Sequence, residues 1–168
     1  SIFTYGMQKG IDRMKAANVK NVSLSNLDAL AVVAAEEGYI KESDVESLHI
    51  YFKRVKIKPS ERPIVLSEFG GYSYKEAGHV ANEKDTYGYK FFKDREKFED
   101  AVISLYENEV IPLIPKGLCG AIYTQLSDVE DETNGLITYD RKVLKVDEAR
   151  VSEMSKKLFE AFDTLTRE

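Results

Sequence analysis

The sequence predicts an α/β fold built from parallel βα units. Short apolar runs alternate with segments whose apolar residues recur at helical spacing, which is the pattern of parallel strands joined by helices. Ile64-Val65-Leu66 is apolar throughout, as expected for a strand that is buried on both faces. A complete (β/α)8 barrel takes about 250 residues, and this chain has 168. We therefore predict a partial, TIM-barrel-like fragment.

The first half of the chain is divided by glycines and a capping residue. Ile2 to Tyr5 form a strand-like run that Gly6 closes, and Val19 to Ser23 alternate as a second strand does. Ser25 with Asp28 forms a candidate capping box, and Gly38 is a candidate C-cap. These signals predict strands at 2–5 and 19–23 and helices at 7–17 and 26–37.

The second half of the chain has clearer signals for where helices begin and end. Asp94 is a candidate N-cap, Pro112 and Pro115 are expected to stop the helix that follows it, and Asp147 is expected to cap the last helix. The glycine-rich and tyrosine-rich residues 69–93 are expected to form a long loop. The predicted strands are 48–52, 64–68 and 120–126, and the predicted helices are 95–110 and 147–165.

Composition excludes several classes of function. The chain carries 24 basic and 29 acidic side chains, a net charge of −5, which disfavours a nucleic-acid surface. No apolar run is long enough to span a membrane. Cys119 is the single cysteine, so an intramolecular disulfide and a cysteine-built metal site are excluded. We expect no cofactor and no metal. Because no signal peptide is visible, we expect a cytoplasmic location.

Residues 44 to about 150 resemble the C-terminal part of the catalytic barrel of family 2 glycoside hydrolases, the β-galactosidase and β-glucuronidase family. Three blocks carry the resemblance: 44–52 (DVESLHIYF), 62–71 (RPIVLSEFGG), and 120–128 (GAIYTQLSD) with the residues up to Lys142. They are similar to the sixth, seventh and eighth barrel strands. The resemblance implies a β-glycoside carbohydrate as the ligand of the parent enzyme.

This resemblance implies a set of site residues. Glu68 corresponds to the nucleophile, because it ends an apolar strand before Gly70-Gly71, and barrel sites are built at strand ends. His49 and Tyr51 share one strand face, and the resemblance implies that Tyr51 donates a hydrogen bond to the nucleophile. Gln125 and Asp128 correspond to a polar pair that faces the sugar.

The second catalytic carboxylate has no counterpart. A retaining glycosidase needs two carboxyl groups about 5–5.5 Å apart. Asn108-Glu109 is predicted on a helix and Asn82-Glu83 in a loop, so both read as solvated charges. We expect this hydrolase fragment to be inactive alone, because it lacks the acid that protonates the leaving group.

Residues 1–47 resemble the C-terminal end of an orotate phosphoribosyltransferase, through Phe3 to Gly6, Val22 to Ser25, Asp28 to Leu30 and Gly38 to Lys41. We find no counterpart to that family's pyrophosphate-binding and catalytic segments. The two resemblances predict a fusion, with a βα segment at 1–45 and the glycosidase-like strands at 46–168.

Two further interpretations stay open from the sequence. The chain is either a non-catalytic βα scaffold or chimera, or a phosphoribosyltransferase-related fragment. A partial barrel also leaves two sheet edges open. We expect these edges to be covered by the N-terminal segment or by a homodimer that pairs edge to edge.

Overall fold

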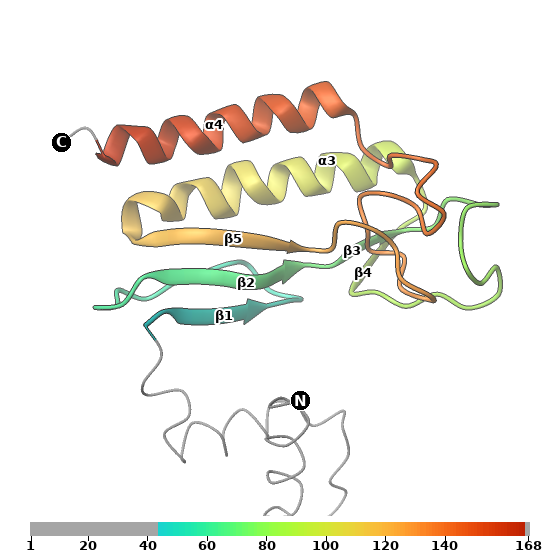
Figure 1. Cartoon of the computed structure of the whole chain (residues 1–168), viewed down its shortest axis with the longest axis horizontal. Coiled ribbons are helices and arrows are strands. Elements are labelled where there is room, and N and C mark those ends of the chain that lie inside the picture. Colours follow the sequence, from blue (N-terminus) through green and yellow to red (C-terminus); the bar gives the residue numbers. More distant parts are fainter. Residues whose placement is uncertain (1–43, 167–168) are drawn as a thin grey trace, which may run out of the picture. The chain divides into compact units, whose positions relative to one another are not determined.

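A computed structural model describes residues 44–166, and from Val45 onward they belong to one compact unit, Val45–Glu168. Its centre is a parallel sheet of β1 (Glu46–Ile50), β2 (Ile64–Gly70) and β5 (Leu118–Thr124), in the order β1-β2-β5 (Figure 1). The predicted α/β class and the parallel pairing of 64–68 with 120–126 are confirmed. The sheet is open, as expected for a partial barrel.

One face of the sheet is covered by helices and forms the core. Leu66 and Phe69 of β2 are fully buried, and Leu118 of β5 joins the same cluster. Burying each large apolar side chain contributes roughly 1.5–3 kcal/mol. The other face, which carries His49, Glu68 and part of β5, is much more exposed in the described residues.

The helix after Asp94 differs from its prediction. Asp94 accepts a hydrogen bond from the Lys97 amide at 3.0 Å and caps α3 (Arg95–Leu105) as expected. The winding then continues through a π-helical turn, η1 (Tyr106–Val110), and a 3-10 helix, η2 (Ile111–Lys116). Pro112 does not stop it, because a proline in the first turn of a helical segment lacks an amide that would have no partner there anyway. Gly117 ends it with a left-handed φ of 104°.

The last helix, α4 (Glu148–Thr166), matches its prediction within one residue at each end. The Asp147 carboxylate accepts from the Arg150 amide at 3.0 Å, which satisfies one of the free donors at the helix start. Met154 on its inner side is buried, whereas Phe159 is 65% exposed.

Residues 69–93, expected as a loop, contain two short strands. β3 (Tyr72–Tyr74) and β4 (Lys90–Phe92) pair in parallel. Tyr72 packs against Phe92, and Tyr74 packs against Phe98 of α3. Aromatic packing onto α3 therefore stabilises the pairing of β3 with β4. The glycine-rich sequence of this segment had indicated a loop instead.

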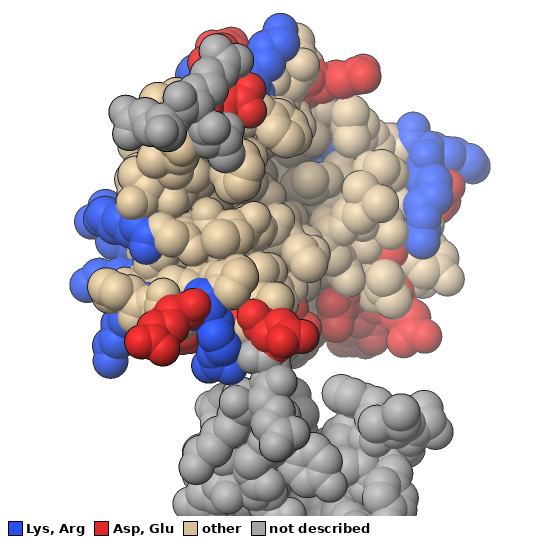
Figure 2. Space-filling view, turned by 60° about the vertical axis from the view of Figure 1, so that its left-hand side comes forward, with Lys and Arg blue, Asp and Glu red and all other residues tan. Residues whose placement is uncertain are grey.

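The remaining predictions differ in position or are not described. β1 begins and ends two residues before the predicted strand 48–52, so that Tyr51 lies just after it. The strands predicted at 2–5 and 19–23 and the helices at 7–17 and 26–37 lie outside the described residues, and the boundary near residue 46 stays a prediction. Figure 2 shows acidic and basic side chains gathered at the rim of one face, around an uncharged middle.

Tyr106 makes stability depend on pH in alkali. Burial raises the pKa of Tyr106 from 10.0 to about 12. The folded state therefore holds this proton more tightly than the unfolded state, so the contribution is full below pH 10 and is lost as pH rises toward 12. We expect Tyr106→Phe to reduce the alkaline fall in the free energy of unfolding, by up to about 1.4 kcal/mol per pH unit. Urea unfolding across this range measures it.

Tyr139→Phe is the matched control, because Tyr139 is 42% exposed. An alkaline fall in stability that is the same in both variants and in the parent protein would contradict the prediction.

Candidate functional site

The candidate site lies at the carboxyl ends of the three parallel strands, on the face away from the helices. Glu68 is near the end of β2, Tyr51 directly follows β1, and Thr124 is the last residue of β5. Parallel strands bring their carboxyl ends to one edge of a sheet, which is where binding sites form in α/β folds. Glu68 and Gln125 thus lie at the same end of the sheet.

Tyr51 connects Glu68 to Thr124. Its hydroxyl lies 3.0 Å from Glu68 Oε2 and 2.9 Å from Thr124 Oγ1. A phenol has one proton, and an ionised carboxylate accepts only. Tyr51 therefore donates to Glu68 and accepts from the Thr124 hydroxyl. This relay fixes one oxygen of Glu68, and no described residue donates to the other.

His49 is the second partner of Glu68. Its Nδ1 lies 3.3 Å from Glu68 Oε2, and the two side chains are 56% and 47% exposed. At this exposure water screens the ion pair that forms when the imidazole is protonated, so it contributes little to stability. Its effect is to orient the carboxylate while leaving it open to solvent.

A stacked pair of tyrosines holds this relay in place. The rings of Tyr51 and Tyr89 are parallel, with centroids 3.9 Å apart and 6° between their planes. The glycines after Glu68 permit this approach: at Gly71, with φ of 65°, a Cβ would collide with the Tyr89 ring. Gly70 likewise has a left-handed φ and lies against the Tyr123 ring. The diglycine thus permits the turn predicted from the sequence and also the tyrosine stack.

The pKa of Tyr51 lies well above its ordinary value. Burial of the phenol is the largest cause, and the Glu68 carboxylate raises the pKa further, while the bond from Thr124 opposes the shift. The Tyr51 hydroxyl therefore remains protonated at neutral pH and stays available as a donor to Glu68.

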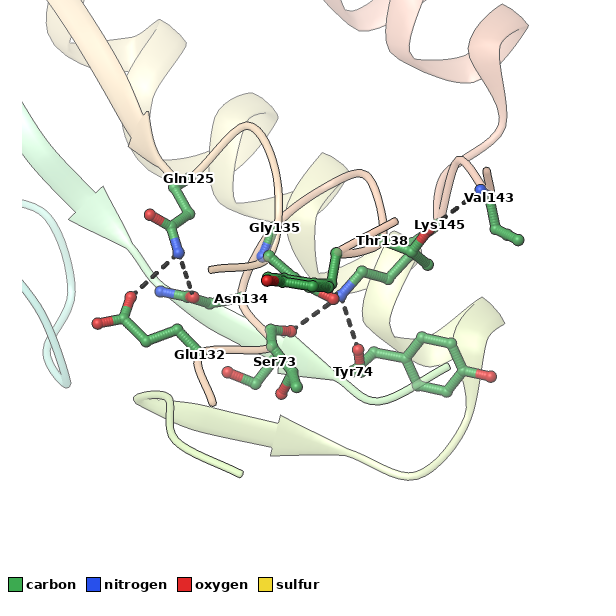
Figure 3. A network of polar contacts seen from close by, with 12 residues as sticks. Ser73, Tyr74, Gln125, Glu132, Asn134, Gly135, Thr138, Val143 and Lys145 are labelled. Atoms are coloured by element: carbon green, nitrogen blue, oxygen red, sulfur yellow. Dashed lines mark hydrogen bonds and ion pairs between the residues drawn. The ribbon is translucent and has the colours of Figure 1, made fainter. Parts of the chain in front are cut away.

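Gln125 reaches this end of the sheet but is held by its own loop. Its amide Nε2 donates to Glu132 Oε2 at 3.0 Å and to Asn134 Oδ1 at 2.9 Å. Both amide hydrogens are thereby used within the protein, as Figure 3 shows. The Gln125 carbonyl oxygen is the atom that remains for a ligand.

Asp128 does not join the exposed group. Its side chain is fully buried, and Oδ1 accepts from Lys145 Nζ at 2.7 Å and from the Gly135 amide at 2.8 Å. The expected contact with a sugar has no support in this geometry, because neither carboxylate oxygen is exposed. The physical reason is that Lys145, which no sequence pattern marked, draws the carboxylate into the interior.

The Asp128–Lys145 pair is the centre of a buried network, and Figure 3 shows Lys145 pointing to Tyr74 within it. Lys145 Nζ also donates to the carbonyls of Tyr74, at 2.8 Å, and Thr133, at 2.9 Å, so all three ammonium hydrogens are used. Burial raises the pKa of Asp128 and lowers that of Lys145, and the bond between the two groups opposes both shifts. The network joins the loop after β5 to β3.

A cavity of about 230 Å³ borders the site. Tyr51, Tyr89 and Gly70 form one part of its lining, and Lys53 and Arg54 line it as well. Among the described residues no group of acidic, histidine or cysteine side chains is arranged to hold a metal ion. No helix within this same part of the chain is both long and apolar enough to cross a membrane.

Sequence reasoning identified Glu68, His49 and Tyr51, which the structure brings together, but missed Thr124, Tyr89 and Lys145. The available signal for Thr124 was its place near the end of the strand that pairs with the strand of Glu68. Tyr89 is separated from Tyr51 by 38 positions, and no local signal connects two such distant aromatic rings.

Comparison with known proteins finds a partial relationship. No family model matches the chain. The chain is similar to the orotate phosphoribosyltransferases of Bacillus mycoides (strain KBAB4) and Bacillus cereus (strain G9842), at 43% identity over 53 residues. The same identity and length hold for the orotate phosphoribosyltransferase of Bacillus anthracis. The match covers 32% of this chain and 25% of each transferase, so the chain spans a quarter of the length of these relatives.

These comparisons correct the classification made from the sequence. The named relatives are phosphoribosyltransferases, and no glycoside hydrolase model matches. The assignment to hydrolases of family 2, with a role in carbohydrate metabolism, is therefore wrong. The transferase resemblance, in contrast, has a partial match among curated proteins.

The buried pair generates a stability prediction. Lys145→Met leaves the Asp128 carboxylate buried without its cation, and we expect a loss of about 3–5 kcal/mol in the free energy of unfolding. The double variant Asp128→Asn/Lys145→Met should recover part of this loss, because no charge is then left buried. Urea unfolding measures all variants.

Lys142→Met is the matched control, since the Lys142 side chain is 74% exposed, and it should change stability by about 0.5 kcal/mol or less. Equal effects of the two lysine substitutions would show that the Lys145 ammonium is not buried.

Proposed function

We propose that this chain is a phosphoribosyltransferase-related fragment joined to a βα unit that binds a polyhydroxylated ligand without catalysing a reaction. The first part is supported by the 43% identity over 53 residues to orotate phosphoribosyltransferases. The second part is supported by the geometry around Glu68. The two parts are tested separately.

In this proposal, the similarity to transferases reflects common ancestry, and this chain has no transferase activity. The matched length is a quarter of the transferase, and the sequence has no recognisable counterpart of that family's pyrophosphate-binding segment. A transferase needs fixed groups around the pyrophosphate that leaves, because its charge develops in the transition state.

We therefore expect the full chain to form no nucleotide from orotate and phosphoribosyl pyrophosphate. The assay follows the loss of orotate absorbance, with the Bacillus cereus transferase as the positive control. Turnover by this chain at a measurable fraction of the control rate would contradict the proposal and would establish a working transferase.

The observation that carries the binding proposal is that only one of the two Glu68 carboxylate oxygens is bonded within the described part of the protein. One oxygen is fixed by Tyr51 and lies beside His49, and the other receives no hydrogen bond from the described residues. Side-chain oxygens held in this way accept strongly from a ligand hydroxyl, because a charged acceptor forms a stronger bond than a neutral one. His49 offers a donor or an acceptor beside it.

An exposed aromatic ring, Phe52, adds an apolar contact surface that suits a hydroxylated, ring-shaped ligand. Phe52 is 83% exposed and packs edge-on against Tyr89, with centroids 5.2 Å apart. The Phe52 ring is connected to the Glu68 carboxylate through Tyr89 and Tyr51, and an apolar ring in the same region as a carboxylate suits a molecule that has C–H groups on its face and hydroxyls at its edge. A cyclic polyol or a monosaccharide is such a ligand.

The test is a titration of the full chain with glucose, galactose and myo-inositol, followed by NMR shifts of the Tyr51 and His49 signals. Glu68→Gln keeps the shape but removes the charged acceptor, and we expect binding to weaken by about 10-fold or more. Glu61→Gln, at an exposed position, is the matched control and should bind as the parent does. Equal affinity of all three proteins would refute the Glu68 site.

A further inference from the structure

Within residues 44–166, β5 has one sheet edge that no other strand pairs with. In the part of the chain that the structure describes, the backbone of Leu118–Thr124 forms ladder bonds with β2 alone. The edge is bounded at its carboxyl end, because the Gln125 amide donates to Asn134 and the Leu136 amide donates to Gln125. The open edge is therefore the seven residues of β5 itself.

This edge lacks the features by which proteins prevent strand pairing. Exposed edges are normally protected by charged side chains, by proline or by very short strands. β5 has seven residues, no charged side chain and no proline. β1 at the other end of the sheet is shorter, carries Glu46 and His49, and has an irregular register after Leu48.

The side chains of β5 fit a second copy of the same strand. Ile122 is 60% exposed, although it lies in the middle of a strand. Gly120, two residues before it, has no side chain, and the atoms nearest to a Cβ added there belong to Val65 of β2. In an antiparallel pair, opposite residues point to the same face with Cβ atoms about 4.5–5.5 Å apart. A two-fold axis at Ala121 places each Ile122 opposite the Gly120 of the partner.

We propose that two copies of this chain pair through β5, antiparallel and with the two-fold axis at Ala121, so that their described three-stranded sheets become one continuous sheet. A two-fold interface brings the same surface patch together twice, so any charge in it would oppose itself or a near neighbour. The neutral β5 meets this condition, whereas the chain as a whole carries −5. The candidate sites of the two copies then open on one shared sheet, at its two opposite ends.

The first test is sedimentation velocity of the full chain over a range of concentrations. We expect a concentration-dependent dimer, and we expect Ile122→Lys to raise its dissociation constant by about 10-fold or more, because each interface loses two apolar contacts. Phe159→Lys, at a side chain on α4 that is 65% exposed, is the matched control and should dimerise as the parent does. A protein that stays monomeric, or a dimer that Ile122→Lys leaves unchanged, would overturn the proposal.

The second test fixes the register. In a Cys119→Ser background, Ala121→Cys should form an intermolecular disulfide under mild oxidation, since the residue on the axis faces its own copy within bridging distance. Phe159→Cys should not crosslink at the same rate. Slow hydrogen exchange of those β5 amides that point away from β2, if it does not vary with protein concentration, would show that another segment of the same chain covers the edge, and would also overturn the proposal.

Discussion

The buried ion pair between Lys145 and Asp128 is the interaction on which the arrangement of the loops depends. Both side chains are almost completely buried. The Lys145 ammonium donates its three hydrogens to the Asp128 carboxylate and to the carbonyls of Tyr74 and Thr133. A buried lysine with an unused donor would be strongly unfavourable, so these three partners must be present together. The pair therefore specifies the positions of β3, of the acidic loop after β5 and of the segment before α4.

The same network reaches the candidate site through the backbone. The Thr133 amide donates to the Tyr87 carbonyl, and the Tyr89 amide donates to the Gly71 carbonyl, both at 3.1 Å. These bonds hold the segment that stacks Tyr89 on Tyr51. Tyr51 in turn fixes one oxygen of Glu68. A group buried in the interior thus helps to set the geometry of an exposed carboxylate, because each contact in this series restricts the next.

Sequence reasoning succeeded where the signal is local. Ile64-Val65-Leu66 reads as a buried strand, Asp94 and Asp147 each stand directly before a helix, and the two-residue spacing of His49 and Tyr51 puts both beside Glu68. It failed where the partners are distant. Lys145 looks like an ordinary surface lysine until the fold brings it to Asp128, and the pairing of β3 with β4 depends on packing against α3.

The family assignment shows a different limit of sequence reasoning. A short motif such as Ser-Glu-Phe-Gly-Gly specifies a carboxylate at a strand end and a tight turn, and the structure contains both. It does not by itself specify a reaction, because the same local geometry serves many functions on related folds. The comparisons find a similarity to transferases over 53 residues, and the geometry carries the proposal of binding.

The central claim is that Lys145 is a buried, fully bonded cation that orders the loops around the site. It is tested most directly by NMR of the lysine side-chain ammonium groups at neutral pH. The account predicts one slowly exchanging ammonium signal with cross-peaks to the Tyr74 and Thr133 neighbourhood, while exposed lysines such as Lys142 exchange too fast to be seen. Exchange of the Lys145 ammonium as fast as that of Lys142 would contradict the account.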